Sequence, residues 1–292
     1  MNLFNIIEEI EKVDPDFQDR ISPRRDAIKN ITSFGSKVAV AALPFALGSI
    51  FKKAYAADTT SLSVAGILNY ALTLEYLEAY LYNQATAAAG LIPASDASYI
   101  ATITTDENNH VTFLQGIITK MGQTPITTPQ IDLTGGDGTG NGPFVNVLSN
   151  YQTFLLLAET LEDTGVRAYK GTAPALVGNQ TVLTAALSIH AVEARHASAI
   201  RYLRTLNYGA SVLPWITSST GHGNDTGFTG VDPNYLGEDN TMQGIIDVTT
   251  LPSLNGSTTS VATATAAFDE PLTMDQVSAL IKGTFIVEVL AP

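Results

Sequence analysis

Glu107-Asn108-Asn109-His110 and Glu193-Ala194-Arg195-His196 are two copies of one Glu-x-x-His spacing. On a helix, residues three apart lie on the same face, so each copy directs a carboxylate and an imidazole toward one point. The chain contains only four histidines, and two of them have this spacing within segments of helical apolar periodicity. The repeated stretch therefore predicts two helices that each carry a pair of metal-binding side chains.

The composition is that of a globular protein, with 45% hydrophobic and 15% charged residues over 292 positions. That length allows one large domain or two ordinary ones. The formal net charge of −13 makes nucleic acid and anionic membranes poor partners and favours cations. The chain has no cysteine, which excludes disulfides, thiolate metal sites, iron–sulfur clusters and a lipoprotein anchor. Any bound metal must therefore have oxygen and nitrogen ligands.

The helical recurrence of apolar residues appears in four segments, 62–89, 95–121, 144–172 and 178–206. Glycine and proline residues follow the first two segments and end them. Residues 123–142 are rich in Thr and Pro and then in Gly, and they fit a long crossover better than a tight hairpin. The sequence thus predicts an all-α four-helix bundle over residues 58–206, with the long crossover between its second and third helices.

Each half of the predicted bundle contains a glutamate followed by a tyrosine at the same spacing. Glu75 precedes Tyr82 by seven residues, and Glu162 precedes Tyr169 by seven, which is two turns along one helix face. The two glutamates also lie 32 and 31 residues before the Glu of the next Glu-x-x-His. The pattern indicates two related hairpins, each with one Glu on its first helix and a Glu-x-x-His on its second.

These residues together predict a centre for two metal ions. Carboxylates can chelate and bridge metals, and imidazoles complete the coordination of each one. Four carboxylates would balance two divalent cations, whereas four uncompensated carboxylates in a bundle core would be prohibitively costly. The predicted metal ligands are Glu75, Glu107, His110, Glu162, Glu193 and His196.

Neighbouring acids and tyrosines leave alternatives open. Glu159 is the alternative ligand on the third helix, although Glu162 has the Leu-Glu…Tyr context found on the first helix. If it binds no metal, Glu159, like Glu78, supports the ligands or lies at the surface. Tyr82 and Tyr169 are the candidate catalytic residues, as hydrogen-bond partners of the ligands or as electron carriers. The alternative for both tyrosines is an ordinary place in the core.

The other histidines and Arg195 have different expected roles. His190 lies one turn before Glu193, where packing or support of the ligands is expected rather than metal binding. Arg195, inside the second Glu-x-x-His, is expected to point away from the metals and to pair with an acid. His222 stands in the Gly-rich stretch 218–224 and is interpreted as a solvated loop residue.

Residues 1–57 have the order of an export signal. Arg24-Arg25 is followed by the apolar run 38–51 and then by Ala54-Tyr55-Ala56, a small-x-small cleavage site. The paired arginines resemble a twin-arginine signal. The alternative is a membrane anchor or a buried helix, but the run contains Pro44 and is shorter than a membrane span of about 20 residues. We expect an exported protein, periplasmic or extracellular, with no stable membrane anchor after signal cleavage.

Residues 207–292 are expected to form an irregular extension, because the helical periodicity fails after the fourth segment and Gly, Thr, Asn, Ser and Pro dominate. The runs 244–248 and 260–264 are candidate strands, so a separate small β domain is the alternative. A short helix from Met274 to Lys282 is expected near the end, with Thr273 as its N-cap.

The order of these motifs resembles that of ferritin-like domain proteins related to the plant desiccation-related proteins. The resemblance rests on Leu74-Glu75 with Tyr82, on the segment from Leu161-Glu162 to Gly171, on both Glu-x-x-His copies and on the tail Phe268-Asp269-Glu270-Pro271-Leu272. It covers about residues 62–205 and that tail. The wider superfamily includes ferritins, bacterioferritins, rubrerythrins and manganese catalases. The resemblance implies a left-handed bundle with a dinuclear centre of two Fe or two Mn ions.

Two functions follow as expectations. The first is a redox enzyme, ferroxidase or catalase-like, that acts on O₂, peroxide or Fe(II) in stress protection. The second is a non-catalytic metal-binding or structural protein of desiccation or envelope stress. The absence of a cysteine-based rubredoxin-like module disfavours a rubrerythrin-type peroxidase. A homo-oligomer is compatible with the resemblance, but no cage-forming pattern supports mineral storage.

Overall fold

The computed structural model describes residues 63–209, 212–216, 226–251 and 258–287. The expected export signal over residues 1–57 and the loop residue His222 lie outside the described residues. Within the described ranges, no helix combines the length and the apolar character needed to cross a membrane.

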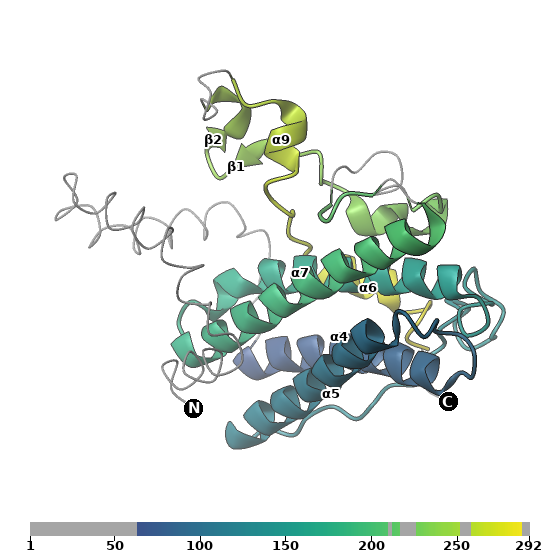
Figure 1. The fold of residues 1–292 in the computed structure, drawn as a ribbon. Helices are drawn as coiled ribbons and strands as arrows, with labels where there is room; N and C mark the ends of the chain where they lie inside the picture. The colour runs from purple at the N-terminus through teal and green to yellow at the C-terminus, as the bar shows by residue number, and fades with distance from the viewer. Residues whose placement is uncertain (1–62, 210–211, 217–225, 252–257, 288–292) are drawn as a thin grey trace, which may run out of the picture. The chain divides into compact units, whose positions relative to one another are not determined.

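Four long helices form the bundle, and they are α4 (Val64–Ala87), α5 (Ala97–Lys120), α6 (Tyr151–Thr172) and α7 (Gln180–Tyr208). Helix α4 packs against α5 and α6 packs against α7, while α4 also contacts α6 and α5 contacts α7. Figure 1 shows these four helices lying side by side. The all-α bundle predicted from apolar periodicity is confirmed, with the expected pairing of consecutive helices.

Local side-chain chemistry determines where the helices begin and end. The Ser63 hydroxyl accepts a hydrogen bond from the Gly66 backbone N–H at 3.1 Å and caps α4. Asn179 caps α7 by accepting from the backbone N–H of Val182 at 3.2 Å. Gly209 ends α7 with φ of 63°, in the left-handed region that glycine adopts without steric strain.

Helix α6 begins at Tyr151, so the predicted start at residue 144 is wrong. The Asn150 side chain caps the helix by accepting from the Thr153 backbone N–H at 2.9 Å. The Asn150 backbone N–H in turn donates to the Asn146 carbonyl at 2.8 Å, which closes a turn before the helix. Apolar periodicity does not detect capping by a side chain. It therefore does not separate the turn that Asn150 closes from the helix that Asn150 caps.

The connection from α5 to α6 runs along the bundle, as a long crossover requires. The Ile126 backbone N–H donates to Asn69 Oδ1 at 2.9 Å, and its carbonyl accepts from the Tyr76 hydroxyl at 3.2 Å, so the connection first lies against the start of α4. Further along, Leu133 enters the same core cluster as Leu81, which lies toward the end of α4. Because the connection spans the bundle, α5 and α6 run in the same direction, and the two hairpins are related by an approximate two-fold axis.

The extension contains only short regular elements in the part that the structure describes. They are η2 (Thr229–Tyr235), β1 (Met242–Gln243), β2 (Ile246–Asp247), η3 (Val248–Thr250), α9 (Val261–Thr265) and α10 (Met274–Ile281). The candidate strand at 260–264 is wrong, because Ser260 caps a helical turn there by accepting from the Thr263 backbone N–H at 3.1 Å. The short helix after Thr273 is confirmed as α10, with a capping box between Thr273 and Gln276.

A buried arginine of α6 attaches this extension to the bundle. The Arg167 side chain is 1% exposed and donates to the carbonyl oxygens of Asn234, Leu236 and Glu270. Its Nε also lies 2.8 Å from Glu238 Oε1. These hydrogen bonds and the ion pair with Glu238 join the extension to α6. Removal of either partner of the ion pair would leave an uncompensated buried charge.

We predict that Gly171→Ala destabilises the protein by about 1–3 kcal/mol, as overpacking of a filled site does. A Cβ at Gly171 would overlap the carbonyl oxygen of Leu272 in the extension. The matched control is Gly116→Ala on α5, where a Cβ meets no atom within 4 Å and alanine should stabilise the helix by up to about 1 kcal/mol. Urea unfolding of both variants measures the difference, and equal effects would show that the extension does not pack on α6.

Candidate metal centre

All six predicted ligands lie together where the four helices meet. Helix α4 contributes Glu75 and α6 contributes Glu162, while α5 and α7 each contribute one Glu-x-x-His. The side chains of the four glutamates are 0% exposed. His110 and His196 are 8% and 4% exposed. The spacing of the sequence motifs therefore corresponds to a single buried cluster in the fold.

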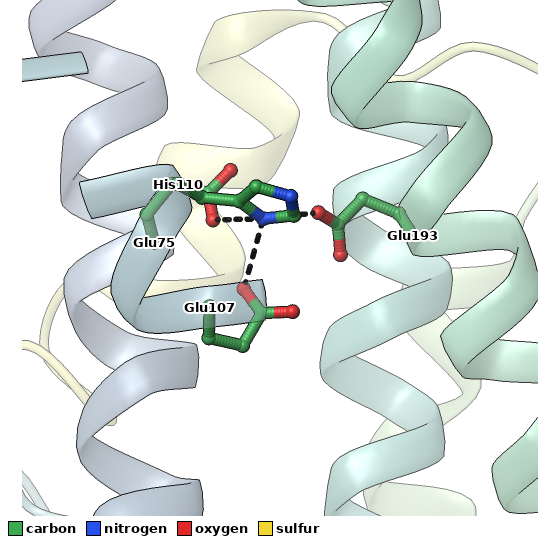
Figure 2. A group of neighbouring side chains, drawn as sticks. All are labelled: Glu75, Glu107, His110 and Glu193. Carbon is green, nitrogen blue, oxygen red and sulfur yellow. Dashed lines mark hydrogen bonds and ion pairs between the residues drawn. The ribbon is translucent and has the colours of Figure 1, made fainter. Parts of the chain in front are cut away.

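The first group of ligand atoms surrounds His110. The group consists of Glu75, Glu107, His110 and Glu193, whose ligand atoms lie within 4.8 Å of one another. Nδ1 of His110 is 3.1 Å from Glu75 Oε2, 3.3 Å from Glu107 Oε2 and 3.1 Å from Glu193 Oε1. Figure 2 shows the three carboxylates, which come from three helices, directed at this nitrogen.

The second group surrounds His196 and shares two residues with the first. Nδ1 of His196 is 2.8 Å from Glu107 Oε1, 3.3 Å from Glu162 Oε2 and 4.0 Å from Glu193 Oε2. Glu107 and Glu193 thus offer one oxygen to each group. The centroids of the two imidazole rings lie 6.2 Å apart.

Each of the two predicted tyrosines donates a hydrogen bond to one of the two glutamates that the groups do not share. The Tyr82 hydroxyl donates to Glu162 Oε1 at 2.5 Å, and the Tyr169 hydroxyl donates to Glu75 Oε1. Burial and the adjacent carboxylates raise the pKa of both tyrosines well above the ordinary value, so both remain neutral donors. Each tyrosine of one hairpin therefore orients a glutamate of the other and leaves its second oxygen facing the cluster.

The structure does not bring the alternative ligand Glu159 into either group. Its Oε2 accepts a hydrogen bond from Arg204 at 2.7 Å, and its Oε1 lies 3.8 Å from Arg201 Nε. A carboxylate neutralised by two guanidinium groups is already compensated within the protein. Glu162, which the matching Leu-Glu…Tyr context favoured, faces the cluster.

Glu78 is a fifth carboxyl group beside the cluster, buried to 2% exposure. Its Oε2 has no hydrogen-bond partner. On α6 the residue that faces Glu78 is Gly165, where a Cβ would lie 3.1 Å from Glu78 Oε1. Burial first, and then the charges of Glu193 and Glu107, raise the pKa of Glu78 well above the ordinary value. Glu78 is therefore held in its neutral form beside the cluster.

The neighbouring His190 and Arg195 lie outside both groups. Nδ1 of His190 lies 2.9 Å from the carbonyl oxygen of Val166, so its N–H donates to the α6 backbone. Burial lowers the pKa of His190, which keeps the imidazole neutral. Arg195 is exposed on α7, and its pairing with an acid stays a prediction. Sequence reasoning missed Asp106, whose Oδ2 lies 3.2 Å from His196 Nε2. The only available signal was its position directly before Glu107.

The electrostatics of the cluster fit bound cations. Within the described residues, both oxygens of Glu193, Oε1 of Glu107 and Oε2 of Glu162 are buried without a hydrogen-bond donor. Burial raises the pKa of Glu107 and of Glu193. Burial alone would lower the pKa of His196, but contacts with Glu162 and Glu107 raise it to about 12. Buried, unpaired oxygens and imidazole nitrogens within one small volume are a donor set that divalent cations satisfy.

The fold and this cluster define a helical-bundle protein with a buried carboxylate–imidazole cluster that could hold metal ions. Residues 63–206 match the family model described as a ferritin-like domain. The protein belongs to the ferritin-like superfamily. No curated protein and no solved structure gives a significant match to the chain. The specific similarity to desiccation-related proteins remains a prediction.

We predict that the metal-free protein loses stability as the pH rises from about 6 to 9. Glu78, Glu107 and Glu193 have raised pKa values in the fold, so the folded state binds more protons than the unfolded state above the ordinary value of 4.5. His110 and His196 act in the same direction above 6.5, because their folded pKa values are also raised. Each excess proton contributes about 1.4 kcal/mol per pH unit, or roughly 3–5 °C in Tm.

Glu78→Gln should make this pH dependence shallower, because glutamine retains the shape of the side chain but cannot ionise. The exposed Asp239→Asn is the control and should leave the slope unchanged. Thermal unfolding of chelator-treated protein across this pH range provides the measurement. A slope that Glu78→Gln does not alter would mean that Glu78 is not a buried neutral acid.

Proposed function

We propose that this protein binds two Fe or two Mn ions in the cluster and uses them in a redox reaction with O₂, peroxide or Fe(II), in protection against stress. The observation that carries the proposal is the sharing of Glu107 and Glu193. Each presents one oxygen to the His110 group and one to the His196 group. A carboxylate positioned in this way serves two metal positions at once.

The ligands divide evenly between the two positions. Glu75 and His110 would hold one ion, Glu162 and His196 would hold the other, and the two shared glutamates would bridge them. The charge of four ionised carboxylates would equal that of two divalent cations. The cations would therefore offset the free-energy cost of burying the negative charge. Bound Fe or Mn would supply Lewis acidity and access to a second oxidation state. Oxygen and nitrogen donors of this kind suit both metals.

The residues around the ligands orient them and exclude water. Tyr82 and Tyr169 fix one oxygen of Glu162 and of Glu75, so the remaining oxygen keeps its direction toward the cluster. The pKa of each hydroxyl is raised by burial, which favours a neutral hydrogen-bond donor over a proton acceptor. Glu78, as a neutral acid beside the cluster, is a buried group that could give a proton. These are the roles proposed for the chain itself in the reaction.

A second candidate function is a metal-binding or structural protein without turnover. Its support is the burial of the ligands, since none of the six is more than 8% exposed. A substrate must reach the cluster, and such burial disfavours free access in the described conformation. The resemblance to desiccation-related proteins would suit this role in desiccation or envelope stress.

The proposal also includes export to the periplasm or the extracellular space. Its support is the twin arginines, the apolar run and the Ala-Tyr-Ala site within residues 1–57. Signal cleavage would leave no stable membrane anchor, and a homo-oligomer is compatible with the proposal. Immunodetection in fractionated host cells tests the export, and an unprocessed cytoplasmic chain would contradict it.

We predict that protein purified from its own host contains close to two metal ions per chain, and that Glu162→Gln lowers the content by about one ion, as loss of a ligand does. Glu159→Gln is the matched control, three residues away on the same helix, and should retain both ions because Glu159 is neutralised by arginine. Elemental analysis measures the content. Less than about half an ion per chain in the unmodified protein would contradict the dinuclear centre.

The redox proposal predicts that metal-loaded protein oxidises Fe(II) or consumes peroxide, and that Glu193→Gln reduces the rate at least tenfold, because a bridging ligand is lost. Spectrophotometric Fe(II) oxidation and oxygen release from peroxide are the measurements. Full metal content with no turnover in either assay would reject the redox function and favour the non-catalytic one.

A further inference from the structure

We propose that the two metal positions are unequal, and that Asp106 makes the position at His196 the tighter of the two. Asp106 acts as a positioning residue through His196 rather than as a ligand. The inference rests on the proposed function, because it concerns the two ions that the cluster would hold.

The two histidines differ on the side of the ring that faces away from the cluster. Nδ1 of His196 faces the carboxylates, and Nε2 lies 3.2 Å from Asp106 Oδ2. With a cation bound at Nδ1, the hydrogen of the ring would be on Nε2 and would be donated to Asp106. Asp106 belongs to α5, whereas His196 belongs to α7, so this bond joins neighbouring helices. Nδ1 of His110 faces the carboxylates in the same way, but its Nε2 has no hydrogen-bond partner among the residues that the structure describes.

The approximate two-fold relation between the hairpins shows why His110 lacks this partner. Asp106 stands directly before Glu107 in the first Glu-x-x-His. The residue that stands directly before Glu193 in the second copy is Val192. Both positions are partly buried on facing helices. The six predicted ligands and the two tyrosine contacts obey the two-fold relation. The change from aspartate to valine is therefore a specific break in the symmetry of the site.

A carboxylate behind a metal-binding imidazole has two physical effects. It fixes the tautomer that presents the bare nitrogen to the metal, and it holds the ring in the orientation that binding requires. It also increases the electron density of the ring and strengthens the bond to a cation. Loss of such a partner typically lowers metal affinity about 10- to 100-fold. His196 has this support and His110 does not, so the two positions should fill in order.

The test is a stepwise titration of chelator-treated full-length protein with Mn²⁺. Binding is measured by calorimetry and by the electron paramagnetic resonance signal of free Mn²⁺. We expect two dissociation constants that differ at least about tenfold. Asp106→Ala should weaken the tighter constant about 10- to 100-fold and leave the weaker one unchanged. Because the Asp106 side chain is 39% exposed, its removal should not prevent folding.

Val192→Asp supplies the matched gain of function. The new carboxylate would lie behind His110 and should tighten the weaker constant toward the other one. His196→Ala and His110→Ala assign the constants, since the first should abolish the tight step and the second the weak step. Asp239→Ala, an exposed acid of the extension, is the neutral control.

Equal constants in the unmodified protein, or an unchanged tight constant in Asp106→Ala, would overturn the inference while the dinuclear proposal stands. Failure of the unmodified protein to bind Mn²⁺ or Fe²⁺ at any concentration tested would instead overturn the proposed function. The two failures are therefore distinguishable from the same set of titrations.

Discussion

The burial of four glutamates at one point is the constraint on which the rest of the structure depends. An isolated carboxylate taken out of water must either find compensation or lose its charge. In this bundle the glutamates face one another across four helices, with unpaired oxygens directed inward. Helix length, the crossover and the fixed tyrosines all serve to hold these like charges within a few ångströms. Such an arrangement is stable only with cations or with protons between the carboxylates.

The two-fold repeat explains how the chain maintains that arrangement. Each hairpin is incomplete by itself, because its tyrosine bonds a glutamate of the other hairpin. Correct packing of α4 against α6 and correct orientation of the ligands are thus one event. The fold couples assembly of the core to assembly of the cluster, so metal binding should stabilise the whole bundle and not only the site.

Sequence reasoning located the helices and the six clustered residues because both follow from short spacings. Apolar periodicity identifies a buried helix face, and a separation of three residues fixes a shared face. The features that short spacings do not determine depend on contacts between helices. Asp106 meets His196 across 90 positions, and Glu78 gains its buried place from Gly165 on another helix. The start of α6 and the helical turn of α9 depend instead on capping by Asn150 and Ser260, which apolar periodicity does not detect.

Helix α6 carries two kinds of buried acid, those neutralised by arginines of the chain and one that faces the cluster. It buries Glu159, Glu162 and Asp163, all of which are at most 1% exposed. Arg204 pairs with Glu159 at 2.7 Å, and Arg201 pairs with Asp163 at 2.6 Å, so α7 supplies a cation for each. Glu162 faces no arginine among the described residues. Its Oε1 is held by a tyrosine, and its Oε2 has no donor. The chain thus neutralises two buried acids with its own arginines and leaves the third beside an imidazole, where its free oxygen could bind a cation.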